Sequence, residues 1–189
     1  MDDPAYAWRI TQHHFGCFRS HWPDEKPFTC LELGPGDSLN SAIFARAFGA
    51  ARTLLVDVAD FAGDNVDGWR SALEYATALG YDVPGLSHEG ARDEALESCS
   101  AEYLVRGLSS LRAVPSGSVD FIWSNAVLEH VGRSQFLELM TELRRITSPA
   151  GMGSHAIDLK DHLGGGLHNL HFPSRVWESP FFSKSGFYT

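Results

Sequence analysis

The sequence predicts a doubly wound α/β fold, and three observations support this. Apolar strand-like runs alternate with helical patterns along the chain, as they do in a mostly parallel sheet covered by helices on both faces. The run Phe28–Leu33 ends in a glycine turn, Gly34–Pro35–Gly36, that leads into a helical pattern. The next apolar run ends on an acidic residue, Asp57. This order is typical of folds that bind a ligand at the carboxyl ends of the strands.

The elements of the first half follow in order. Residues 1–22 are polar and aromatic and predict a helix that belongs to the fold. After the first strand we expect a helix over 38–48 and a second strand over 53–58. Residues 68–79 predict a helix, since Trp69, Leu73, Ala76 and Leu79 fall on one face. A third strand is expected over 102–105.

The second half has the clearest pattern. A turn at 115–118 precedes an alternating fourth strand over 119–124, and residues 133–147 carry an apolar stripe at helical spacing. Residues 149–151, Pro-Ala-Gly, predict the end of that helix, and 152–157 a fifth strand. We therefore expect one domain over 1–189, divided into a helical cap (1–27), a ligand-binding core (28–159), and a loop with an aromatic-rich tail (160–189).

Composition excludes several classes of protein. The 189 residues are 43% hydrophobic and 21% charged, as in globular domains, and no apolar run approaches the roughly 20 residues of a membrane span. The three cysteines form no CxxC pair, which favours reduced thiols and a cytoplasmic location over disulfides or structural zinc. The net charge of -9 and the scattered basic residues disfavour a nucleic-acid partner.

The residues around the glycine turn discriminate between two ligand classes. A dinucleotide site requires G-x-G-x-x-G, and Leu39 occupies the third glycine position. Glu32 precedes Gly34 by two residues, where its carboxylate would repel a pyrophosphate but attract a sulfonium or an ammonium group. Asp57 is placed to accept both ribose hydroxyls of a nucleoside. Charge and turn together favour S-adenosylmethionine.

Four motifs now resemble those of class I methyltransferases. Glu32-Leu-Gly-Pro-Gly-Asp-Ser38 resembles the glycine motif (D/E)xGxGxG, with Ser38 in place of the third glycine, and Leu54-Leu-Val-Asp-Val58 resembles the second motif. Residues 119–130, VDFIWSNAVLEH, resemble the fourth-strand motif, and 144–151, RRITSPAG, the helix end that follows it. The resemblance covers about residues 28–159. It implies a Rossmann-like sheet that binds S-adenosylmethionine.

The same resemblance implies a role for each matching position. Glu32 would hold the methionine ammonium, Asp57 the ribose, and Val58 would lie beside the adenine. The other cofactor-binding positions that it implies are Gly34, Pro35, Gly36 and Asn125 near the methionine moiety, and Leu108 and Ser109 near the adenine. Many relatives have an acidic residue after the third strand that meets the adenine amino group, and residues 106–109 contain none.

Candidates for chemistry are histidines that follow the fourth and fifth strands. His130 and His162 could act as a base if the acceptor is a hydroxyl that must lose a proton. For His130 the alternative is a histidine that packs a short helix. Asp158 and Asp161 lie near His162, so this segment could be either a metal site or a solvated polar loop. The spacing of these residues matches no strong metal-ligand pattern, so we expect no metal.

The end of the sequence departs from the family pattern. Class I methyltransferases finish with an antiparallel hairpin beside the fifth strand, and the loop-rich residues after 159 predict that this hairpin is missing. We expect the exposed edge of the fifth strand to pair in a homodimer, or the aromatic tail over 172–188 to fold across it. The expected function is methyl transfer to a small-molecule or glycan hydroxyl. The alternatives are a protein or nucleic-acid methyltransferase, or a non-catalytic domain that binds the cofactor or a partner.

Overall fold

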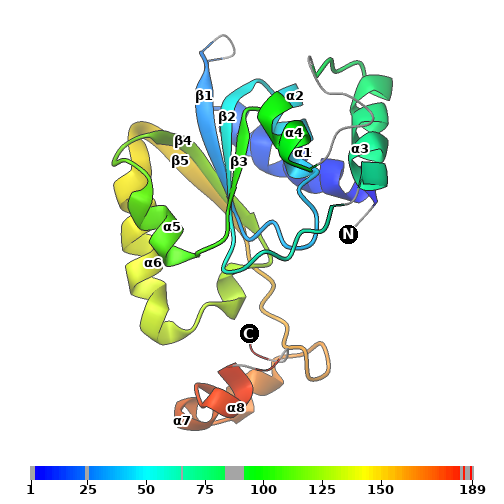
Figure 1. Cartoon of the computed structure of the whole chain (residues 1–189). Coiled ribbons are helices and arrows are strands. Elements are labelled where there is room, and N and C mark those ends of the chain that lie inside the picture. The colour runs from blue at the N-terminus through cyan, green and yellow to red at the C-terminus, as the bar shows by residue number, and fades with distance from the viewer. Residues whose placement is uncertain are drawn as a thin grey trace.

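The computed structural model describes residues 3–23, 26–64, 66–83, 92–183, 185 and 188. Its centre is a parallel sheet of five strands in the order β3-β2-β1-β4-β5 (Figure 1). The strands are β1 (Phe28–Leu33), β2 (Ala50–Val56), β3 (Ala101–Leu104), β4 (Val119–Asn125) and β5 (Thr147–Ala156). The strand order reverses direction between β1 and β4, where ligands bind in folds of this type. The predicted doubly wound α/β class is confirmed.

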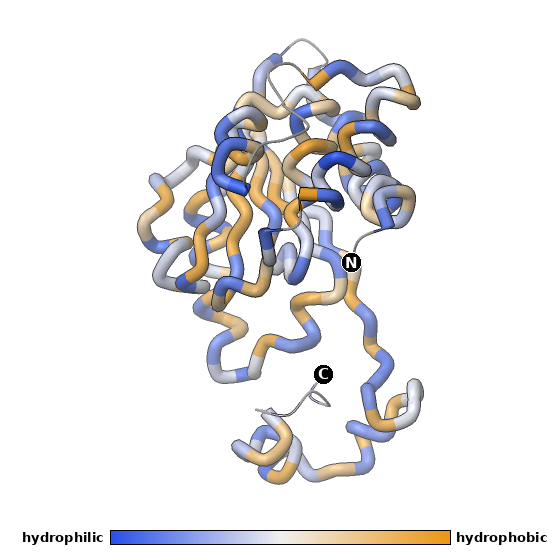
Figure 2. Tube along the Cα trace, turned by 45° about the vertical axis from the view of Figure 1, so that its right-hand side comes forward, coloured by the Kyte–Doolittle hydropathy of each residue, from blue (hydrophilic) through white to orange (hydrophobic). Residues whose placement is uncertain are grey.

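Helices cover both faces of the sheet. One face carries α1 (Pro4–Arg19), α2 (Ser41–Ala47), α3 (Val66–Ala78) and α4 (Arg92–Ser98), while α5 (Leu108–Ala113) and α6 (Arg133–Ile146) cover the other. Alternation along each strand divides the core accordingly: Leu31 and Leu33 of β1 face α6, whereas Cys30 and Glu32 face α1 and α2. Figure 2 shows that hydrophobic residues concentrate in the strands between these layers. Among the described residues, no helix is long and apolar enough to cross a membrane.

Helix α1 is fixed to the sheet by aromatic side chains. The rings of Phe18 and Phe121 stack with centroids 4.6 Å apart, and Phe15 meets Phe121 edge to face at 5.1 Å. Both phenylalanines of α1 are 1% exposed. Burying such rings stabilises the fold by about 1.5–3 kcal/mol each. The expected N-terminal helix is therefore an integral layer of the domain.

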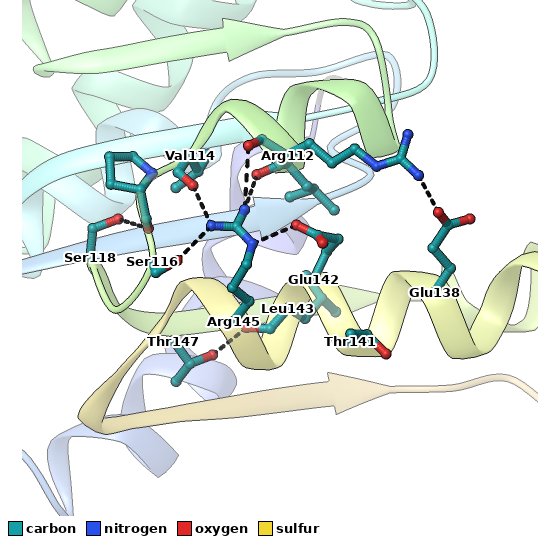
Figure 3. A network of polar contacts seen from close by, with 12 residues as sticks. Arg112, Val114, Ser116, Ser118, Glu138, Thr141, Glu142, Leu143, Arg145 and Thr147 are labelled. Atoms are coloured by element: carbon teal, nitrogen blue, oxygen red, sulfur yellow. Dashed lines mark hydrogen bonds and ion pairs between the residues drawn. The ribbon is translucent and has the colours of Figure 1, made fainter.

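The end of α6 is held to the opposite face by Arg145 (Figure 3). Its guanidinium donates to the carbonyl oxygens of Val114 (2.9 Å) and Leu111 (3.0 Å), and to the side chains of Ser116 (3.0 Å) and Glu142 (2.7 Å). These carbonyls end α5 and begin the loop before β4, so one side chain satisfies several helix-end acceptors. Arg145, a basic residue of the motif RRITSPAG, therefore has a structural role.

Element boundaries and several short helices differ from the sequence-based prediction. Helices α4 and α5 were not predicted, because six or seven residues contain too few turns to show a periodicity. Strand β5 begins at Thr147, directly after α6, and not at 152. Pro149 is compatible with a strand there because β5 is an edge strand in the described sheet.

The C-terminal segment leaves the sheet after β5 and lies beyond the carboxyl ends of the strands (Figures 1 and 2). It contains η2 (His168–His171), α7 (Ser174–Trp177) and α8 (Pro180–Ser183). Its aromatic rings pack on one another, with centroids of Trp177 and Phe182 4.7 Å apart and of Phe172 and Trp177 5.5 Å apart. Phe187 lies outside the described residues. The tail does not fold across β5, contrary to one of our two expectations, and pairing of that edge in a homodimer stays a prediction.

Candidate functional site

The glycine turn after β1 lies at the centre of the carboxyl edge of the sheet. Gly34 and Gly36 have positive φ values of 69° and 73°, which side chains other than glycine rarely adopt. A Cβ atom on Gly34 would come within 2.6 Å of a Val127 methyl group. The turn therefore needs glycine at Gly34 for its conformation and for the close approach of the loop after β4.

Asp57 follows β2 and contacts the same turn. Its Oδ2 accepts a hydrogen bond from the Gly36 N–H at 3.0 Å, and its Oδ1 accepts from the Val58 N–H at 2.7 Å. The residue is 8% exposed. A carboxylate oxygen has two lone pairs, so each oxygen can accept one further hydrogen bond. Asp57 holds the turn and still presents acceptors at the end of β2.

Glu32 is a buried acid whose loss of hydration is offset by little more than one hydrogen bond. It is 8% exposed, and its Oε2 accepts a short hydrogen bond from the Ser41 hydroxyl. Burial raises the pKa of Glu32 to about 8, against the effect of the Ser41 hydrogen bond and with a smaller contribution from the charge of Asp57. A nearby cation would reverse this effect, because it favours the ionised carboxylate.

A cavity of about 130 Å³ opens beside Glu32 on the α1 side of the sheet. It brings together four predicted cofactor positions, Glu32, Gly34, Pro35 and Asn125. Tyr6 and Thr11 of α1 also line it, so the N-terminal helix borders the site as expected.

Sequence reasoning missed Trp123, which lines the same cavity. The β1–β4 register pairs Trp123 directly with Glu32, so the two side chains are neighbours on one face. Trp123 is 2% exposed, and its Nε1 has no acceptor within the described part of the chain. A buried acceptor and a buried donor thus stand side by side. The signal was available: Trp123 lies two residues before Asn125 on the same strand, hence on the same face.

A second, more apolar cavity of about 210 Å³ lies on the α5–α6 side of the turn. Its lining includes the predicted residues Asp57, Val58 and Leu108, and it shares Gly34 with the first cavity. Val58 is 73% exposed although it borders this cavity. Ser109 is exposed on α5 and is not among the residues that line either cavity. The two cavities meet at Gly34 and are together called the cleft; its Glu32 side has more polar lining residues and its α5–α6 side more apolar ones.

The two candidate bases come together. The rings of His130 and His162 have centroids 5.2 Å apart, and His130 lines the apolar cavity. The Nδ1 of His130 is 2.8 Å from the backbone carbonyl oxygen of Tyr188. A carbonyl oxygen can only accept, so Nδ1 carries the proton, and Nε2 of the neutral ring keeps its lone pair.

Asp161, next to His162, stabilises the loop after β5 through hydrogen bonds to its backbone. Asp161 is 1% exposed and accepts hydrogen bonds from the backbone N–H groups of Leu163, Gly164, His168 and Asn169. Burial acts to raise its pKa, but the hydrogen bonds from Asn169 and His168 outweigh this and lower it to about 2. Among the described residues, no group of three or more His, Cys, Asp or Glu is arranged to hold a metal ion.

Comparison with known proteins identifies this arrangement. A family model described as a methyltransferase domain matches residues 62–153, from the loop after Asp57 through β3, β4 and α6 into β5. Residues 62–153 are thus similar to a methyltransferase domain. Class I methyltransferases, whose motifs this sequence resembles, use S-adenosylmethionine as the methyl donor. A search of curated proteins found no match.

Solved structures with a similar arrangement include methyltransferases from several organisms. An S-adenosylmethionine-dependent methyltransferase from Mesorhizobium loti is 19% identical, with a TM-score of 0.45, over 78% of this chain and 53% of that one. A complex of the Trm112 methyltransferase activator with a putative methyltransferase from Haloferax volcanii is 18% identical, with a TM-score of 0.47, over 82% of this chain and 56% of that one. A putative S-adenosylmethionine-dependent methyltransferase from Listeria monocytogenes is 15% identical, with a TM-score of 0.46, over 79% of this chain and 55% of that one. The chain thus spans little more than half the length of these structures.

Proposed function

We propose that this chain binds S-adenosylmethionine in the cleft on both sides of Gly34 and transfers its methyl group to a small-molecule or glycan hydroxyl. The observation that carries the proposal is Glu32, a buried acid beside a cavity and without a cationic partner among the described residues. When bound, the sulfonium of the cofactor supplies an electrophilic methyl group. The residues present fit the cofactor at both of its ends.

The polar end of the cleft matches an amino acid. Glu32 offers a carboxylate to the ammonium group, and the neighbouring Trp123 Nε1–H offers a donor to the carboxylate group of methionine. Tyr6 also lines this cavity. We propose Trp123 as a binding residue in addition to the positions implied by the family motifs.

The apolar end matches a nucleoside. Asp57 presents free acceptor sites to the two ribose hydroxyls, and Val58 and Leu108 flank a space for the adenine ring. Burying the exposed Val58 side chain against the base would stabilise the complex by up to about 1.5 kcal/mol. In this proposal Ser109 has no direct contact with the adenine.

The proposed base is His130, through Nε2. The Tyr188 carbonyl fixes the tautomer and orientation of the ring, as a second group does for many catalytic histidines. His162 lies close enough to assist or to replace it. Heteronuclear NMR above neutral pH would report which nitrogen of His130 is protonated. We expect Nδ1, and a spectrum with the proton on Nε2 would remove this role.

Calorimetry tests the cofactor proposal without knowledge of the acceptor. S-adenosylhomocysteine should bind more tightly than NAD, and Trp123→Phe should weaken it roughly tenfold through loss of a charge-assisted hydrogen bond. The matched probe is methylthioadenosine, which has no amino-acid end and should bind the Trp123→Phe variant and the parent chain equally. Tighter binding of NAD, or an equal loss of both nucleosides in the variant, would contradict the assignment.

A further inference from the structure

A third cavity, of about 310 Å³, lies between the sheet edge and the C-terminal segment. Glu129, Val131 and Arg133 line it from the loop after β4 and the start of α6, while Asn169, Glu178 and Tyr188 line it from the tail. Val131 also borders the apolar cavity of the cofactor cleft, so the two spaces are neighbours. Glu129 belongs to the fourth-strand motif, but none of the proposed cofactor contacts lies in this cavity.

Two buried oxygen atoms in its walls lack a donor. Glu129 Oε2 and Asn169 Oδ1 are both fully buried and have no hydrogen-bond partner in the part of the chain that the structure describes. The rest of each residue is fixed: Glu129 Oε1 accepts from the Asp158 N–H at 3.2 Å, and the Asn169 N–H donates to Asp161 at 3.1 Å. Buried acceptors without partners are costly, and both residues line the cavity, so a ligand with N–H or O–H donors there could satisfy them.

The other polar groups of the cavity satisfy one another. Tyr188 donates its hydroxyl to Glu178 Oε2 at 2.8 Å, and Arg133 Nε lies 3.4 Å from Glu178 Oε1. The charges of Glu178 and Arg133 therefore balance, and the carboxylate of Glu129 is left without a cation in the cavity wall. A protonated amino group supplies both the positive charge and several donors, which a neutral hydroxyl does not.

We propose that this cavity binds the methyl acceptor and that the acceptor carries a protonated amino group, held by Glu129 and Asn169. The inference rests on the proposed methyl transfer and narrows its substrate class to amino-bearing small molecules such as amino sugars. In this proposal the protein recognises the acceptor by its amino group. His130 lies beside the cavity, because its Nδ1 donates a hydrogen bond to the carbonyl of Tyr188, which lines the cavity. An anionic acceptor would be repelled by Glu129.

The test compares glucosamine with N-acetylglucosamine by saturation-transfer NMR, on the full chain with S-adenosylhomocysteine present, near pH 6.5. The two sugars share one ring, but only the first has a protonated amine. We expect glucosamine to bind at least tenfold more tightly, and Glu129→Gln to remove most of that difference. Glu138→Gln, on the exposed face of α6 where Glu138 pairs with Arg112, is the control and should change nothing.

A second variant keeps the test decisive if Glu129→Gln fails to fold. Asn169→Asp adds a negative charge beside Glu129 and should raise the affinity for glucosamine severalfold. Equal binding of the two sugars, no binding of either at tens of millimolar, or an unchanged preference in both variants would overturn the inference and leave a water-filled cavity. Binding of S-adenosylhomocysteine to the parent chain separates the cases: its loss refutes the proposed cofactor site, while its retention with no sugar preference refutes only the acceptor subsite.

Discussion

Replacing Glu32 with glutamine should strengthen the fold and weaken the site. Burial raises the pKa of Glu32 to about 8 in the folded chain, against about 4.5 for the unperturbed group. The folded state therefore holds this proton more tightly than the unfolded state does. The associated stability is fully present below about pH 4.5 and is lost as pH rises through 8. A neutral glutamine of the same shape avoids that loss.

The magnitude follows from the two pKa values. Between them the wild-type chain loses up to about 1.4 kcal/mol per pH unit relative to the variant, or roughly 3 kcal/mol near pH 7. Ser41 can still donate its hydroxyl to the side-chain amide oxygen in the Glu32→Gln variant, so the substitution leaves no new unpaired hydroxyl. Urea denaturation at pH 5.5, 7 and 8.5 measures the difference, which should grow steadily with pH.

Cofactor affinity should change in the opposite direction. Loss of a charge-assisted hydrogen bond to the ammonium group weakens S-adenosylmethionine binding by about ten- to a hundredfold. The ligand amine also titrates near pH 8, so the informative quantity is the ratio of wild-type to variant affinity, which should rise with pH. A stability difference that is independent of pH, together with unchanged affinity, would refute this account of Glu32.

Further predictions concern the turn and its supports. Gly34→Ala should destabilise the chain in urea by about 2–4 kcal/mol, because its Cβ meets Val127 at 2.6 Å, whereas Gly36→Ala, with open space around the new atom, should cost only the roughly 1 kcal/mol of its positive φ. Equal losses would show that the approach of Val127 is unimportant. Asp57→Ala should weaken cofactor binding in calorimetry roughly ten- to a hundredfold, and Asp57→Asn less. Arg145→Ala should lower the unfolding free energy by about 2–4 kcal/mol while cofactor affinity stays unchanged, and a loss under about 0.5 kcal/mol would contradict the role of its hydrogen bonds.

The core of the fold was predictable because its signals are local. The apolar run of β1, the alternation in β4 and the periodicity of α6 identify each element without reference to its neighbours. Glu32 and Asp57 were predicted as site residues for a related reason, since charge beside a glycine turn constrains the ligand at short range. Short helices such as α5 carry no such pattern, and the position of Ser109 depended on one of them.

What the sequence could not supply was proximity between distant segments. Trp123 became a candidate only when the β1–β4 register set it beside Glu32. The cavity at Glu129 is formed by the tail, whose path depends on aromatic packing among Phe172, Trp177 and Phe182. Residues that are about 40 positions apart in the chain meet there, and no spacing rule reports such a contact.

Buried polar atoms without partners show where the domain gives up stability. Three of them, on Trp123, Glu129 and Asn169, border cavities at the carboxyl edge of the sheet, and the acid Glu32 adjoins the first. At the opposite end of the sheet, where no ligand is expected, the guanidinium of Arg145 is fully engaged in hydrogen bonds. Each unpaired group costs about 1–3 kcal/mol, and a ligand that binds only the folded state returns that energy. Because the unpaired atoms are a donor on Trp123 at one cavity and acceptors on Glu129 and Asn169 at another, one small ligand cannot satisfy them all. We therefore propose two ligands: a zwitterionic nucleoside beside Glu32 and Trp123, and a cationic acceptor beside Glu129.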